Sequence, residues 1–196
     1  MVQLLKEMEE YAKENNIPIM MDDGLKFIED YIKKNNVKRI LEIGSAIGYS
    51  AIRMCLNENI CITTIERDEV RYKEAVKNIK KAKLENQITL IYDDALNIDL
   101  DEKYDLIFID AAKGQYIKFF KKFEKNLSEK GAIISDNLKF HGYTEQKERI
   151  KSKNLRQLVN KIRKYIEFLK ENNTYQTTFY DIGDGIGVTK KRTDDC

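Results

Sequence analysis

Short apolar runs alternate along this chain with longer segments whose apolar residues recur at helical spacing. Five of the runs have the length and composition of buried parallel strands and cover residues 40–43, 61–66, 88–92, 104–110 and 132–136. The segments around them predict helices over 3–15, 22–32, 46–56, 68–82, 117–127 and 154–171, the second capped by Asp22 or Asp23. Two last runs, 177–180 and 186–190, flank Asp-Ile-Gly-Asp-Gly, which is typical of a hairpin.

This order of elements predicts an α/β protein. Five strands that alternate with helices form a Rossmann-like, doubly wound, mostly parallel sheet, and the terminal hairpin brings it to seven strands with an antiparallel C-terminal hairpin strand. We expect one domain over 1–196, in which the helices of residues 1–36 cover the ligand side.

The stretch from Val37 to Ser50 predicts a strand, a glycine turn and a helix, the first half of a nucleotide-binding unit. Gly44 and Gly48 allow the backbone to approach a ligand closely. The spacing Glu-x-Gly-x-x-x-Gly-x-Ser differs from the dinucleotide fingerprint Gly-x-Gly-x-x-Gly. Glu42 would repel a pyrophosphate, and it suits a ligand that carries a cationic amino group.

Acidic residues follow the predicted strands. Glu66 ends the second strand 22 positions after Gly44, where a carboxylate can accept hydrogen bonds from a ribose hydroxyl pair. Asp94 ends the third strand and can accept from an adenine amino group, while Ala95 leaves room for the ring. Ligands bind outside the carboxyl ends of the strands in such sheets. One composite site is therefore expected, and its acids are Glu42, Glu66, Asp94, Asp110 and Asp136.

Asp110, Asp136 and Asn137 follow two strands that should be neighbours. Each acid alone could serve as a helix cap or turn former. Together they would repel one another unless a cation joins them, and three oxygen ligands suit a hard ion such as Mg²⁺.

Lys113 opens the next helix. It is either an ordinary surface lysine or a general base, because a nearby divalent cation favours the neutral amine. His141, the only histidine, either lines the acceptor pocket or is a polar loop residue.

Composition limits the partners and the cellular location that are expected for the protein. Its formal net charge of +2 gives no polyanion-binding signal for the whole chain of 196 residues. The sequence predicts neither a membrane span nor a signal peptide, so no membrane partner is expected. Three cysteines without metal spacing predict free thiols, buried at Cys55 and Cys61, and a cytoplasmic location.

Four ordered motifs resemble the divalent-metal-dependent O-methyltransferases that include catechol O-methyltransferase: residues 41–50, 107–113, 135–137 and 183–185. The resemblance implies S-adenosyl-L-methionine as cofactor, a divalent metal on Asp110, Asp136 and Asn137, Lys113 as base, and a homodimer. It implies cofactor contacts at Met20, Ser50, Glu66, Asp94 and Ala95, to which we add Glu42, Gly44 and Asp110. The sequence departs from the family pattern at Asp93, where a glycine is usual, and its N-terminus is short.

The acceptor is expected to be one of two kinds. Residues 16–20 and 46–53 most resemble the bacterial tRNA 5-hydroxyuridine methyltransferases, which implies the wobble position of a tRNA anticodon loop. Residues 138–170 carry ten Lys or Arg against three acids, which favours RNA; candidate contacts are Lys139, Lys151, Lys153 and Arg156. A solvated helix face would explain the same charges, and the alternative acceptor is a small catechol-like molecule. A non-catalytic nucleotide-binding or NAD-linked domain is a third hypothesis, which Glu42 and the hairpin disfavour.

Overall fold

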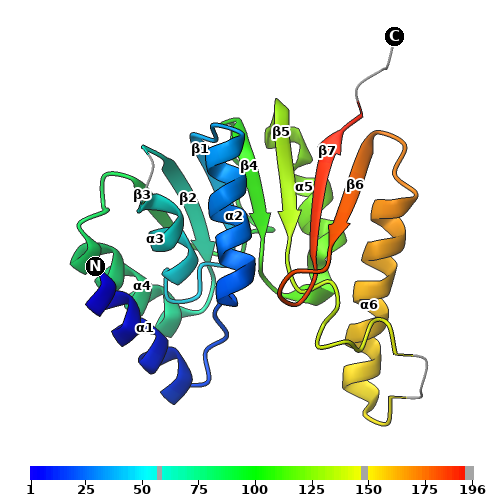
Figure 1. Cartoon of the computed structure of the whole chain (residues 1–196), viewed down its shortest axis with the longest axis horizontal. Coiled ribbons are helices and arrows are strands. Elements are labelled where there is room, and N and C mark those ends of the chain that lie inside the picture. The colour runs from blue at the N-terminus through cyan, green and yellow to red at the C-terminus, as the bar shows by residue number, and fades with distance from the viewer. Residues whose placement is uncertain (57–58, 147–149, 193–196) are drawn as a thin grey trace.

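A computed structural model describes residues 1–56, 59–146 and 150–192. Its centre is a seven-stranded sheet of order β3-β2-β1-β4-β5-β7-β6 (Figure 1). The parallel strands are β1 Arg39–Ile43, β2 Cys61–Glu66, β3 Ile88–Tyr92, β4 Tyr104–Ile109 and β5 Leu127–Ser135. β6 Tyr175–Tyr180 and β7 Ile186–Lys191 form the hairpin, and β7 pairs antiparallel with both β5 and β6. The predicted fold class is confirmed.

The central strands are mostly apolar because helices cover both faces of the sheet. In β4, Leu106 and Phe108 belong to one core cluster, whereas Ile107 and Ile109 belong to the other, and all four are fully buried. The first face packs against α1 Val2–Glu14, α2 Asp22–Lys34, α3 Tyr49–Cys55 and α4 Glu69–Ala82. The second packs against α5 Tyr116–Phe123 and α6 Lys153–Lys170. Two 3-10 turns, η1 Lys113–Gln115 and η2 Glu124–Asn126, flank α5.

Several element ends differ from the sequence prediction. The helix expected from residue 46 begins at Tyr49, because Gly48 has a φ of +82° and ends the turn. β5 begins at Leu127, where the preceding helix was expected to end. Met21 caps α2, whereas Asp23 accepts hydrogen bonds from the backbone N–H groups of Gly24 and Gly183, so the cap prediction was wrong. Cys61 was expected to be buried and is exposed, whereas Cys55 is buried as predicted.

Within the described ranges, no helix is both long and apolar enough to cross a lipid bilayer.

Candidate active site

A cavity of about 460 Å³ lies at the carboxyl ends of the parallel strands. Residues from the ends of β1 to β5, the segment 18–21 before α2 and Asp184 of the β6–β7 turn all contribute to its wall. The sequence-predicted residues that it brings together are Met20, Gly44, Ser50, Glu66, Asp94, Ala95, Asp110, Lys113, Asp136 and Asn137. Four of the five acids predicted for one composite site therefore line one cavity, and Glu42 is the one that does not.

Gly44 forms the sharp turn where β1 leaves the sheet. Its φ is +96°, and a Cβ at this position would lie 2.4 Å from the carbonyl oxygen of Asp110. Only glycine therefore allows the ends of β1 and β4 to come this close. The backbone N–H of Asp110 also donates to the carbonyl oxygen of Ile43 at 3.1 Å, which fixes Asp110 beside the turn.

Glu42 is fully buried and does not line the cavity. Its two carboxylate oxygens accept hydrogen bonds from Ser50 Oγ and Thr64 Oγ1, each at 2.5 Å. Burial raises its pKa to about 7, against the opposing effect of these two hydrogen bonds. The prediction that this carboxylate itself meets a ligand is therefore corrected. Ser50 lines the cavity in its place, and since its proton is directed to Glu42, its oxygen is free to accept from a ligand.

Glu66 is held by two backbone groups at the end of β2. Oε2 accepts from the N–H of Ala46 at 2.9 Å, and Oε1 accepts from the N–H of Asp68 at 2.8 Å. Each carboxylate oxygen can accept a further hydrogen bond. The side chain is thus oriented in advance, and it can still accept from two neighbouring hydroxyls.

The end of β3 forms a tight turn around two acids. Asp94 accepts from the N–H of Leu96 at 2.9 Å and from Arg67 Nη1 at 3.1 Å. The backbone hydrogen bond from Leu96 and, after it, Arg67 lower the pKa of Asp94. Asp93 stabilises the same turn, because its Oδ1 accepts from the N–H of Asp94 at 2.7 Å. Ala95, which follows, is buried and lines the cavity.

Asp110 and Asp136 are two acids that repel each other at the ends of β4 and β5. Burial raises the pKa of both carboxyls, and repulsion from Asp110 helps to bring that of Asp136 to about 7. The positive charge of Lys113 acts in the opposite direction on both acids. Ionisation of both acids therefore costs free energy, and a nearby cation would stabilise their negative charge.

The donor set fits a divalent cation. Two carboxylates and the amide of Asn137 share one cavity wall, and oxygen donors of this kind suit Mg²⁺. No cluster of three or more His, Cys, Asp or Glu side chains suited to a metal occurs among the described residues. Any metal here would therefore depend on the amide oxygen of Asn137 as well as on the two acids.

Asp184 is a site residue whose role the sequence analysis missed. It is 7% exposed and lines the cavity, and its Oδ1 accepts from the backbone N–H of His141 at 2.5 Å. Its Oδ2 accepts from Asn137 Nδ2 at 3.3 Å. The available signal was Gly183-Asp184-Gly185, which we interpreted as a hairpin turn and as a family motif, without assigning a role to Asp184. The side chain of His141 itself is 73% exposed at the cavity, with Nδ1 3.7 Å from Asp184 Oδ2.

A family profile described as O-methyltransferase matches residues 1–192 of the chain. The chain belongs to this O-methyltransferase family. The match confirms the family that the motifs predicted, whereas metal dependence, the tRNA acceptor and the homodimer stay predictions.

Several proteins are similar to this O-methyltransferase over most of its length. Tapetum-specific methyltransferase 1 of Arabidopsis thaliana is 29% identical, and the match covers 96% of this chain and 86% of the relative. Caffeoyl-CoA O-methyltransferase of Populus kitakamiensis is 26% identical over 95% of this chain and 86% of its own length. A crystal structure from Staphylococcus aureus, of a protein provisionally named a caffeoyl-CoA O-methyltransferase, is 39% identical with a TM-score of 0.90. That match covers 96% of this chain and 92% of the other.

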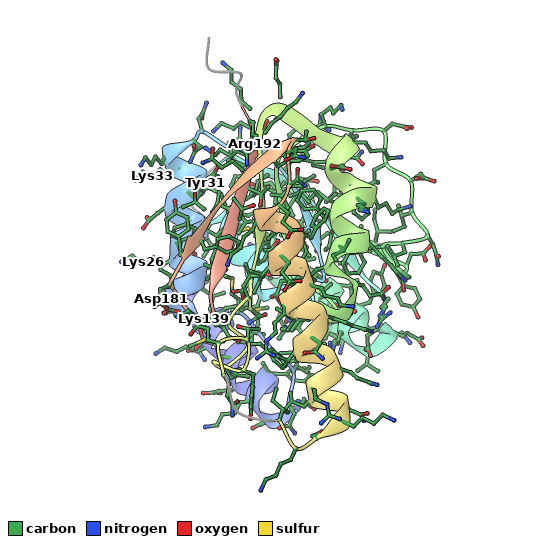
Figure 2. The ribbon with its side chains drawn as sticks, turned by 90° about the vertical axis from the view of Figure 1, so that its right-hand side faces the viewer. Lys26, Tyr31, Lys33, Lys139, Asp181 and Arg192 are labelled. Carbon is green, nitrogen blue, oxygen red and sulfur yellow. The ribbon has the colours of Figure 1, made fainter. Side chains whose placement is uncertain are left out.

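Two of the four predicted RNA contacts of this O-methyltransferase have structural roles. Lys139 Nζ lies 2.7 Å from Asp181 and 3.5 Å from Glu145, and Figure 2 shows Lys139 and Asp181 beside each other. Arg156 donates to the carbonyl oxygen of Ile150 at 3.0 Å. Lys151 and Lys153 are exposed at the start of α6. Two further basic residues of the 138–170 segment, at 147 and 149, lie outside the described residues.

Proposed function

We propose that this O-methyltransferase moves the methyl group of S-adenosyl-L-methionine to a hydroxyl that has a second oxygen on the neighbouring carbon. The observation that carries the proposal is the shared cavity. The glycine turn and Glu66 line the same space as Asp110, Asp136 and Lys113. This shared cavity supports a donor site for a nucleoside next to an acceptor site for a chelating group.

The donor would lie along the ends of β1, β2 and β3. Glu66 suits the two ribose hydroxyls, because both of its oxygens are oriented and each can accept once more. Asp94 and Ala95 suit the adenine ring, and Met20 covers the cavity from the segment before α2. Ser50 and Asp110 are left for the amino end of the methionine portion.

The acceptor would lie over the ends of β4 and β5. Asp110, Asp136 and Asn137 would hold a divalent cation, most simply Mg²⁺. When bound, the cation would offset the repulsion of the two acids and acidify a hydroxyl beside it. Lys113 lines the same cavity and would take the hydroxyl proton. The acceptor oxygen then forms its bond to the methyl carbon as the carbon–sulfur bond breaks, leaving a methyl ether and S-adenosylhomocysteine.

A small molecule with vicinal oxygens on an aromatic ring is our first acceptor class. The relatives support it, because their names include a flavonoid 3',5'-methyltransferase of Vitis vinifera at 27% identity and a catechol O-methyltransferase of Niastella koreensis. The latter is 35% identical over 58% of this chain. A catechol would present two adjacent oxygens to the cation site.

The second candidate acceptor is 5-hydroxyuridine at the wobble position of a tRNA anticodon loop. It offers the same geometry through its 5-hydroxyl and 4-carbonyl oxygens. The observation that favours it is the charge at the start of α6. Lys151 and Lys153 lie there without an acid in the first turn, although a helix N-terminus favours negative charge. Lys161 lies next to the residue after Lys113, since a Cβ at Gly114 would lie 3.3 Å from its Nζ. We propose a homodimer of this chain with either acceptor.

A methyl-transfer assay with labelled S-adenosyl-L-methionine tests both acceptors. Purified protein is given catechol, caffeoyl-CoA or tRNA that carries 5-hydroxyuridine, each with Mg²⁺ or with excess EDTA. We expect transfer that requires Mg²⁺ and is lost in Asp110→Ala and Asp136→Ala. Asp99→Asn should stay active, because Asp99 pairs only with Lys122 and Lys125 on the surface among the described residues. Full transfer in EDTA would remove the metal from the proposal, and the acceptor with the higher kcat/KM decides between the two classes.

A further inference from the structure

Asp184 lies beside the acceptor wall but is not one of the residues expected to hold the cation. We infer that it is a positioning residue, which fixes the amide of Asn137 so that the amide oxygen faces the cation site. The inference rests on the proposed function, because it concerns a metal ligand of that site.

The first observation is the direction of one hydrogen bond. Asn137 Nδ2 donates to Asp184 Oδ2 at 3.3 Å. An asparagine amide has one donor end and one acceptor end, and a carboxylate can only accept. Asp184 therefore selects the nitrogen and leaves Oδ1 of Asn137 directed elsewhere. A cation needs that oxygen, and hydrogen-bond partners of metal ligands commonly set ligand orientation in this way.

The second observation is the backbone that carries Asn137. Asn137, Phe140 and His141 have φ values of +59°, +46° and +55°, a conformation that side-chain-bearing residues rarely adopt. Asp184 holds this loop through the N–H of His141 at 2.5 Å, and its own carbonyl oxygen accepts from the N–H of Lys139 at 2.8 Å. One buried acid thus fixes both the side chain of Asn137 and the loop after it.

The β6–β7 turn is itself held in place, so that Asp184 can act as an anchor. The N–H of Leu138 donates to the carbonyl oxygen of Gly185 at 2.9 Å. A Cβ at Gly185 would lie 2.8 Å from the backbone nitrogen of Lys139, so only glycine permits this contact. On the other side, Asp23 of α2 accepts from the N–H of Gly183 at 3.1 Å.

The test measures cation binding and loop opening separately in full-length protein. Mn²⁺ affinity is measured by electron paramagnetic resonance, and hydrogen exchange of the peptide covering residues 138–146 is measured without metal. Asp184→Ala should weaken Mn²⁺ binding 10- to 100-fold and speed exchange in the loop. Asp184→Asn keeps one acceptor oxygen and should give a smaller change of both. Asp99→Asn is the control, and it should change neither, because Asp99 is 78% exposed and among the described residues pairs with Lys122 and Lys125, which are not part of this loop.

Each outcome decides the inference. Weaker Mn²⁺ binding with unchanged exchange would overturn positioning and make Asp184 a direct ligand. Unchanged Mn²⁺ binding in folded Asp184→Ala and Asp184→Asn, with folding shown by S-adenosylhomocysteine calorimetry, would also overturn it. Failure of wild-type protein to bind Mn²⁺ would instead refute the metal site of the proposed function, and with it this role of Asp184.

Discussion

At the scale of single residues, Gly44 has no room for a side chain, because an added Cβ would lie 2.4 Å from the carbonyl oxygen of Asp110. We expect Gly44→Ala to lower the free energy of unfolding by at least ~3 kcal/mol, because a methyl group there adds a clash with backbone to an unfavourable φ. Gly142→Ala is the control, since Gly142 has a φ of +80° but nothing within 4 Å of an added Cβ. It should cost only about 1–2 kcal/mol. Urea denaturation measures both, and equal losses would show that the clash is relieved by movement.

The buried carboxyl of Glu42 should make the stability of the protein depend on pH. Its pKa is raised to about 7 in the folded protein, so between its ordinary value and pH 7 the folded state retains a proton that the unfolded chain has lost. Stability therefore falls as pH rises through this window. Glu42→Gln cannot ionise, and its free energy of unfolding relative to wild type should increase by about 3 kcal/mol between pH 4 and pH 8.

Urea denaturation of the ligand-free proteins at several pH values measures this difference. The acids at the cation site titrate in both proteins, and what differs between the two is the carboxyl of Glu42 with the repulsion between it and Asp110. Glu85→Gln, at an exposed position, should show no such trend. A difference between Glu42→Gln and wild type that is constant with pH would refute the assignment.

At the scale of elements, Arg53 connects the helix of the glycine turn to both N-terminal helices. It donates to Glu29 at 2.9 Å and to Asp22 at 2.8 Å, both in α2. It also donates to the hydroxyl of Tyr49 at 3.2 Å, and that hydroxyl donates to Glu9 of α1 at 2.5 Å. Tyr49 and the segment 18–21 line the cavity, so this network sets one wall of the cofactor site.

Arg53→Met should therefore destabilise the fold by about 1–3 kcal/mol and weaken S-adenosylhomocysteine binding severalfold. Calorimetry and thermal unfolding measure the two effects. Lys73→Met removes an exposed ion pair with Glu69 within α4, and it should change neither stability nor affinity measurably. Full S-adenosylhomocysteine affinity in Arg53→Met would show that α1 and α2 hold the cavity wall without it.

Elements with strong local signals were predictable from the sequence, and those that depend on tertiary contacts were less so. β2 and β3 were predicted at their observed bounds, because each is a short run rich in β-branched residues. The role of Glu42 was not predictable, since its strand position did not reveal that Ser50 and Thr64 would take both of its oxygens. Asp184 lies 47 residues from Asn137, and no local pattern links residues so far apart.

At the scale of the whole molecule, net charge is nearly balanced, but its distribution bears on the tRNA candidate. Lys151→Glu with Lys153→Glu should weaken tRNA binding and reduce the dependence of log K on log salt by about two. Lys26→Glu with Lys33→Glu is the control, because these exposed lysines of α2 lie away from the start of α6 (Figure 2). S-adenosylhomocysteine affinity should stay constant in both. Equal tRNA affinity in all three proteins would leave the small-molecule acceptor as the better proposal.

The antiparallel position of β7 has a consequence for the order in which the site forms during protein synthesis. Of the seven described strands of the sheet, β7 is synthesised after the other six, yet it lies between β5 and β6. Until it leaves the ribosome, β5 has an open edge and Asn137 has no anchor, although Glu66, Asp110 and Asp136 are already made. At 5–20 residues per second, the hairpin needs about 1–3 s of translation. During that interval the nascent chain holds every acid of the cation site, and it gains an oriented amide only when its final hairpin docks.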